Sequence, residues 1–129
     1  MSHAALLKEL EAILFDPNYD PIAAIVKGEE KRGFRVVRPG GEPWFRAVEW
    51  RAESVASVSG DTVRLVLLHC FEEGKGAFTR TVKRIEDASL KPSVIDPTQE
   101  FAATLTRRGW RENKMGRSFA TRETIWRPK

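Results

Sequence analysis

The chain has 129 residues, of which 41% are hydrophobic and 31% charged, and it carries a formal net charge of +4. This length suits one domain with a modest core. The single cysteine, Cys70, excludes an internal disulfide and a multi-cysteine metal site, and it indicates a reducing compartment. The sequence contains no run of about 18 apolar residues and no basic-then-apolar leader. We therefore expect a cytoplasmic protein without a membrane span.

The first thirty residues predict two short helices. Between residues 4 and 15, apolar side chains recur every three or four positions, which is the period of an amphipathic helix that Pro17 then ends. In the second helix, Asp20 is placed to cap the first turn and Pro21 suits the first helical position. Gly28 is the expected end of this helix.

After Gly33 the apolar pattern changes to the alternation typical of β-strands. The predicted strands cover residues 34–38, 44–50, 54–58, 62–71 and 77–85. Short loops join them as antiparallel hairpins, and the glycine-bearing loop 72–76 is one of these connections. Such a sheet must bury one face, either by curling into a small barrel or by accepting helices.

The remaining chain predicts a third helix and a last strand. Asp96 and Pro97 fit the cap and first turn of a helix that runs to Arg108, and Gly109 ends it. Alternation over residues 118–126 predicts the final strand. The expected fold is thus a single α+β domain, with an antiparallel sheet of four to six strands, two N-terminal helices and one C-terminal helix.

Positive charge gathers at the C-terminal end of the sequence. Residues 101–129 contain eight Lys/Arg and two Asp/Glu, a local charge of +6, which leaves −2 for residues 1–100. Trp110, Phe119 and Trp126 lie among these cations, and cations combined with flat rings bind phosphates and stack on bases. This pattern predicts a protein that binds nucleic acid, DNA or RNA, or another polyanion without catalysing a reaction.

The candidate binding residues form two groups. The first group is the C-terminal cluster, in which Trp110 serves as a stacking or positioning residue: Arg107, Arg108, Trp110, Arg111, Lys114 and Arg117. The second group extends the patch if strands 62–71 and 77–85 pair as a hairpin: Arg64, Arg80 and Arg84. The plain alternative is that both groups are solvated surface, with lysine and arginine on strand edges deterring aggregation.

An interaction with an acidic protein partner is the alternative function. Trp44, Trp50 and Trp126 are the aromatic residues through which such a partner would dock. The same side chains also fit a hydrophobic core, because large aromatics dominate the cores of small proteins. For Trp44 and Trp50 the core interpretation is the favoured one.

Catalysis has little support in the sequence. His69 and Cys70 are neighbours on a predicted strand, so their side chains point to opposite faces and do not form a nucleophile–base pair. A metal-dependent nuclease would use Glu72 and Glu73 with Asp61 or Asp87, but no motif fixes that geometry. We therefore assign no catalytic residue, metal site or cofactor from the sequence.

Overall fold

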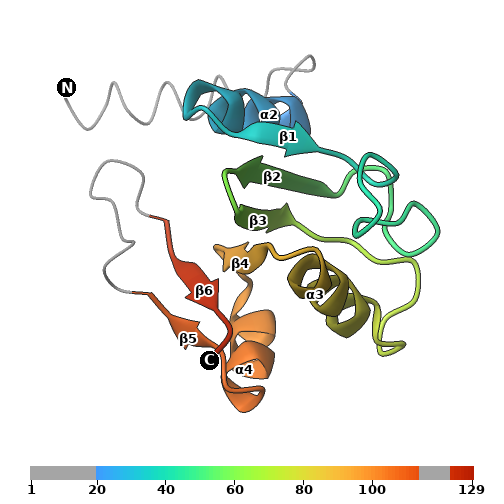
Figure 1. Ribbon diagram of the computed structural model, residues 1–129, viewed down its shortest axis with the longest axis vertical. Coiled ribbons are helices and arrows are strands. Elements are labelled where there is room, and N and C mark those ends of the chain that lie inside the picture. The colour runs from blue at the N-terminus through green and yellow to red at the C-terminus, as the bar shows by residue number, and fades with distance from the viewer. Residues whose placement is uncertain (1–19, 114–122) are drawn as a thin grey trace, which may run out of the picture.

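The computed structural model describes residues 20–113 and 123–129 (Figure 1). The helix predicted over residues 4–15 lies outside the described residues. Within them, the chain forms three helices and six strands: α2 (Pro21–Lys31), β1 (Arg35–Val37), β2 (Val55–Ser59), β3 (Thr62–Leu67), α3 (Ala77–Asp87), β4 (Lys91–Ile95), α4 (Gln99–Arg107), β5 (Arg111–Glu112) and β6 (Ile125–Arg127).

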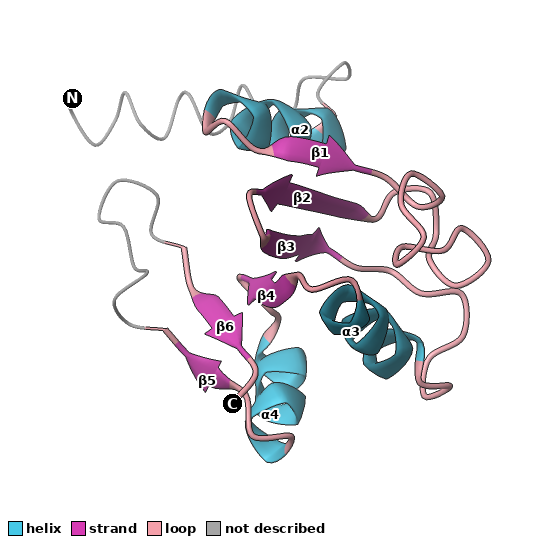
Figure 2. Cartoon of the chain, viewed as in Figure 1, coloured by secondary structure: helices cyan, strands magenta, loops and turns pink. Residues whose placement is uncertain are grey.

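The six strands form one sheet in the order β1-β2-β3-β4-β6-β5. Neighbouring strands are antiparallel except β3 and β4, which are parallel. The α+β class and the mainly antiparallel sheet are confirmed, whereas the barrel expectation is wrong because the sheet is open, with β1 and β5 at its edges. Figure 2 shows the strands as one twisted layer with helices beside it. One helix, α3, lies between strands, so the predicted helix arrangement does not hold.

Helix α2 begins as the sequence predicts but ends later. The Asp20 carboxylate accepts hydrogen bonds from the backbone N–H groups of Ile22, at 3.0 Å, and Ala23, at 3.3 Å, and Pro21 occupies the first helical position. Gly28 lies inside the helix, and the left-handed glycine that follows the helix is Gly33, with φ of +86°. The extra turn carries a buried glutamate, Glu29, whose contacts hold the helix against the sheet.

The predicted strand 44–50 is wrong. This segment is a turn-rich loop whose only bridges are Glu42 with Phe45 and Trp50 with Cys70. Side-chain packing rather than strand pairing holds this segment, because Trp44, Phe45 and Trp50 are all buried. The Trp44 and Phe45 rings stack, and the Phe45 ring meets the Trp50 ring at a tilt of 49°. The favoured core interpretation of Trp44 and Trp50 is thus confirmed.

The predicted strand 77–85 is also wrong, because it is helix α3. Its buried residues are Ala77, Thr81 and Ile85, which recur every four positions as on one face of a helix. A spacing of four is even, so it also fits strand alternation. Loop 72–76 is accordingly no hairpin, and the chain instead crosses from β3 through α3 to the parallel strand β4, as parallel pairing requires. Residues 91–95, for which the sequence predicted no strand, form a buried inner strand.

Helix α4 confirms the third predicted helix, with a different cap. Thr98, not Asp96, caps it by accepting a hydrogen bond from the Phe101 N–H at 3.2 Å. At its end, the Trp110 N–H donates to the Leu105 carbonyl at 2.9 Å while Gly109 adopts φ of +85°, which is the Schellman arrangement. The chain then enters β5 directly. Of the final strand expected over 118–126, residues 118–122 lie outside the described residues, and β6 pairs between β4 and β5.

Candidate nucleic-acid interface

Five cationic residues lie near the end of α4, the start of β5 and the end of β6, and we call this group the basic corner: Arg107, Arg108, Arg111, Arg127 and Lys129. The Schellman turn at Gly109 reverses the chain, so the last turn of α4 lies next to β5. Lys129 packs beside the same glycine, with its Cβ 4.0 Å from the place that a Cβ would take on Gly109. The corner lies at the edge of the sheet, near the C-terminus in Figure 1.

Arg111 and Arg127 lie directly opposite each other on the antiparallel β5–β6 pair. Like charges in this position destabilise a sheet. Both arginines are exposed, and neither forms an ion pair with a carboxylate in the part of the chain that the structure describes. The arrangement therefore concentrates positive potential at one edge, and a bound anion would relieve the repulsion.

The two arginines of α4 extend this positive surface. Arg107 donates to the Thr104 hydroxyl at 3.1 Å within its own helix, and Arg108 donates to the Thr79 hydroxyl of α3 at 2.7 Å. Both lie at the C-terminal end of α4, where the helix dipole favours cations. Neutral hydroxyl partners leave their positive charges uncompensated.

Trp110 lies in the core, directly after the turn that ends α4 at the basic corner. Its side chain is buried, and its ring lies 5.5 Å from the Phe78 ring of α3, between centroids. The Arg108 guanidinium lies over the same Phe78 ring, 5.8 Å from its centroid. A buried indole offers no face to a base, so the structure does not support the stacking role predicted for Trp110.

Lys114 and Arg117, the other two members of the predicted cluster, lie outside the described residues. Arg127 and Lys129 belong to the corner but were missed as candidates from the sequence. The sequence feature that could have identified them is the local charge of +6 over residues 101–129, to which both contribute. Only the β5–β6 register shows that Arg127 lies opposite Arg111.

Arg64 lies apart from the basic corner, in the interior. Only 6% of the residue is exposed, and its guanidinium contacts the carboxylates of Glu29 at 3.0 Å and Glu123 at 2.7 Å. Its guanidinium carbon is also 4.6 Å from the centroid of the Phe34 ring. Arg32 forms a further ion pair with Glu123. Arg64 thus joins α2, β3 and the segment before β6.

Arg80 and Arg84 are occupied as well, and they lie on α3 rather than on a hairpin partner of Arg64. Both form ion pairs with the carboxylate of Glu49, Arg80 through its Nε at 2.7 Å. Arg80 also donates to the Lys75 carbonyl at 2.5 Å. Burial raises the pKa of Glu49, but the hydrogen bonds from Arg84 and Arg80 outweigh it and lower that pKa below its ordinary value. These arginines fasten loop 38–54 to α3.

The candidate catalytic residues do not gather into a site. Among residues 20–113 and 123–129, no group of three or more His, Cys, Asp or Glu side chains is placed to hold a metal ion. His69 Nδ1 lies 2.6 Å from the Glu53 carboxylate on the surface, and Cys70 is half-buried in the bridge with Trp50. The described chain thus offers no support for the nuclease alternative.

The exposed apolar surface is small. Among the large hydrophobic residues that the structure describes, only Val48 and Phe71 are highly exposed, at 71% and 48%. Backbone pairing brings them near each other, since the Phe71 N–H donates to the Glu49 carbonyl at 3.1 Å. The Arg51 guanidinium covers one face of the Phe71 ring at 5.0 Å. Trp44 and Trp50, expected at such a surface under the protein-partner alternative, are instead in the core.

Comparison with protein-family models, with curated proteins and with solved structures found no match for this chain. None of the described helices is both long enough and apolar enough to cross a membrane. The function therefore has to be argued from the side chains themselves, and the basic corner gathers several cations without an ion pair among the described residues.

Proposed function

We propose that the protein binds nucleic acid, or a polyanion of similar phosphate chemistry, through the basic corner and without catalysis. The observation that carries the proposal is the direct opposition of Arg111 and Arg127 on the edge of the sheet. Two unpaired arginines at this spacing are costly in the protein alone. They become favourable when phosphate oxygens lie between them, because each guanidinium offers a planar fork of donors.

The same geometry favours contact with the phosphate backbone over contact with bases. Trp110 is buried against Phe78 and presents no stacking surface. Arg107, Arg108 and Lys129 surround the arginine pair with further positive charge. Phosphate contacts fix position but carry no sequence information. We therefore expect strong salt dependence and little preference for sequence.

Fluorescence anisotropy with labelled single- and double-stranded DNA and RNA across a salt series tests the proposal. For duplex DNA, five phosphate contacts predict a slope of log affinity against log salt of about −4.5. The variant R111Q/R127Q should lose about two units of that slope. The matched control K27Q/R46Q removes two exposed charges from α2 and from loop 38–54, and it should bind nearly as the parent does.

Absence of binding at low salt, or equal losses in the two double variants, contradicts the proposal. The second outcome would mean that net charge matters and the corner does not. Circular dichroism of each variant shows whether the fold is kept.

Docking on an acidic protein is the second candidate, and the exposed pair Val48 and Phe71, with Arg51 beside them, favours it. An apolar contact flanked by a cation suits a partner segment with an aromatic or aliphatic anchor and a carboxylate. A pull-down from nuclease-treated extract tests this role. Recovery of one partner by the parent chain and its loss with V48S/F71S would favour it over nucleic-acid binding.

A further inference from the structure

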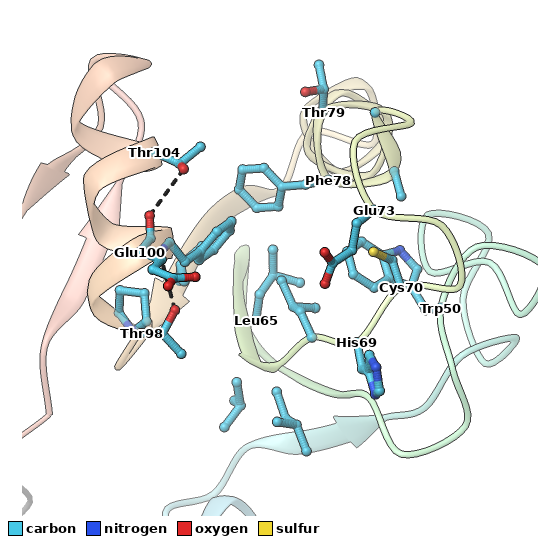
Figure 3. Close-up of a pocket in the computed structure, with 18 of the residues that line it drawn as sticks. Trp50, Leu65, His69, Cys70, Glu73, Phe78, Thr79, Thr98, Glu100 and Thr104 are labelled. Carbon is cyan, nitrogen blue, oxygen red and sulfur yellow. Dashed lines mark hydrogen bonds between the residues drawn. The ribbon is translucent and has the colours of Figure 1, made fainter.

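A cavity of about 710 Å³ opens where the parallel strands β3 and β4 end, between α3 and α4 (Figure 3). In open sheets, ligands bind in the crevice outside the carboxyl ends of parallel strands. The volume is also within the usual range for small-molecule sites, about 300–1,000 Å³. The position and size of this cavity both suit a small ligand.

The inner surface of the cavity is largely apolar and partly aromatic. Phe78 of α3 and Phe101 of α4 both line it and are in edge-to-face contact with each other, with centroids 5.0 Å apart and ring planes at 82°. Leu65 and Val94, on the paired strands β3 and β4, line its floor. Such a surface takes the apolar body of a ligand, and the faces of the rings attract cations.

Two carboxylates on opposite sides of this apolar surface define the charge that the ligand must carry. Glu73 belongs to the loop before α3, and its carboxylate points into the cavity in Figure 3. Glu100 lies in the first turn of α4. Among the described residues, neither carboxylate has an ion-pair or hydrogen-bond partner.

Of the other charged groups that line the cavity, Asp96 and His69 have polar partners, whereas Glu72 is a further carboxylate without an ion pair among the described residues. The Asp96 carboxylate accepts a hydrogen bond from the Thr124 N–H at 2.7 Å, and the His69 ring bonds to Glu53. Arg108 also lines the cavity, donates to the Thr79 hydroxyl and lies over Phe78, and its positive charge has no carboxylate partner among the described residues. Because Glu72, Glu73 and Glu100 outnumber Arg108, the net uncompensated charge of the lining is negative, which is opposite in sign to the basic corner.

We propose that this cavity binds a small organic cation, a primary amine on an aromatic or aliphatic body. The ammonium group lies between Glu73 and Glu100, and the apolar body packs against Phe78 and Phe101. An anion would meet two carboxylates in this position. The ligand therefore differs from the polyanion of the basic corner, and this site does not depend on that function.

Isothermal titration of the full chain at neutral pH, with three probes of similar size, tests the charge requirement. Tryptamine carries an ammonium, 3-methylindole is neutral and indole-3-acetate is an anion. We expect saturable binding of tryptamine at least about tenfold tighter than that of the other two. E73Q and E100Q should each weaken tryptamine binding by about tenfold, because each removes one contact to the charged group.

E30Q is the matched control, since Glu30 is an exposed carboxylate on α2 without a described ion pair. It should leave tryptamine binding unchanged. A duplex DNA competitor should not displace tryptamine, which separates this site from the basic corner. The proposal is overturned if tryptamine shows no saturable binding, if 3-methylindole or indole-3-acetate binds as tightly, or if E73Q and E100Q bind as E30Q does. Because both glutamates are exposed, these variants are expected to fold, and thermal melting checks that.

Discussion

Arg64 and Glu29 form a bidentate ion pair in the protein interior, with Nη2 3.0 Å from Oε1 and Nε 3.1 Å from Oε2. The pair joins β3 to the last turn of α2 across 35 positions of sequence. Ser57 of β2 donates to the same Glu29 carboxylate at 3.2 Å. Because its oxygens accept these hydrogen bonds, the Glu29 carboxylate orients α2 on the sheet. Removing it would leave the buried Arg64 charge without full compensation.

Replacing Glu29 with glutamine should destabilise the protein by about 3 kcal/mol, the cost of leaving a buried partner charge uncompensated. Glu123 remains as a second partner of Arg64 and limits the loss. Urea unfolding followed by circular dichroism measures the change. The control is E42Q, which breaks the more exposed pair with Arg35 and should cost less than about 1 kcal/mol. Similar losses of unfolding free energy in E29Q and E42Q would show that burial does not determine how much an ion pair contributes to stability.

The carboxylate of Glu49 should make stability depend on pH in the acid range. Its pKa is lowered in the folded protein from the ordinary 4.5, because hydrogen bonds from Arg84 and Arg80 outweigh the effect of burial. A lowered folded pKa means that the contribution is fully present above 4.5 and is lost as the pH falls through the folded value. E49Q should therefore cost about 2 kcal/mol near neutrality and progressively less in acid.

Unfolding free energies of the parent and E49Q at neutral pH and at several acid values measure this difference. The control is E30Q, whose difference from the parent should stay small throughout. A gap between parent and E49Q that stays constant into acid would contradict the assignment.

The hydrogen bond from Trp50 Nε1 to the Thr81 hydroxyl, 2.8 Å long and buried, should couple loop 38–54 to α3. W50F leaves the hydroxyl without its donor, and T81V leaves the indole N–H without its acceptor, so each should cost about 2 kcal/mol. The double variant removes both polar groups and should cost less than the sum of the two. A double-mutant cycle by urea unfolding measures the coupling. Strict additivity would mean that the bond contributes nothing.

Local signals in the sequence were sufficient where a few adjacent residues determine the structure. Asp20 and Pro21 predicted the start of α2, and Gly109 predicted the end of α4, because caps and left-handed turns depend on immediate neighbours. The apolar run that includes Val63 and Leu65 predicted β3 for a similar reason, because a strand buried on both faces is apolar along its length.

Long-range pairing was not predictable in the same way. Phe78 and Val82 are four residues apart, a spacing that fits both a helix face and alternate strand positions, so α3 was predicted as a strand. The partners of Arg64 lie 35 and 59 positions away, and its charge was therefore counted as surface. The basic corner was predicted from composition in its α4 and β5 residues, whereas Arg127 joins it only through the register of β6.

Two glycine-to-alanine changes should have opposite effects on stability. Gly28 lies inside α2, and a Cβ there meets no atom within 4 Å, so G28A should stabilise the protein by up to about 1 kcal/mol through helix propensity. Gly109 holds φ of +85° in the Schellman turn, and G109A should cost about 1–2 kcal/mol because an L-residue is strained there.

The same change displaces the turn that places Arg108 next to Arg111, so G109A should also weaken DNA binding, whereas G28A should not. Urea unfolding and anisotropy on both variants measure the two effects. If G109A matched G28A in stability, the left-handed turn would not be what ends α4, and if it matched G28A in affinity, the turn would not be what aligns the basic corner.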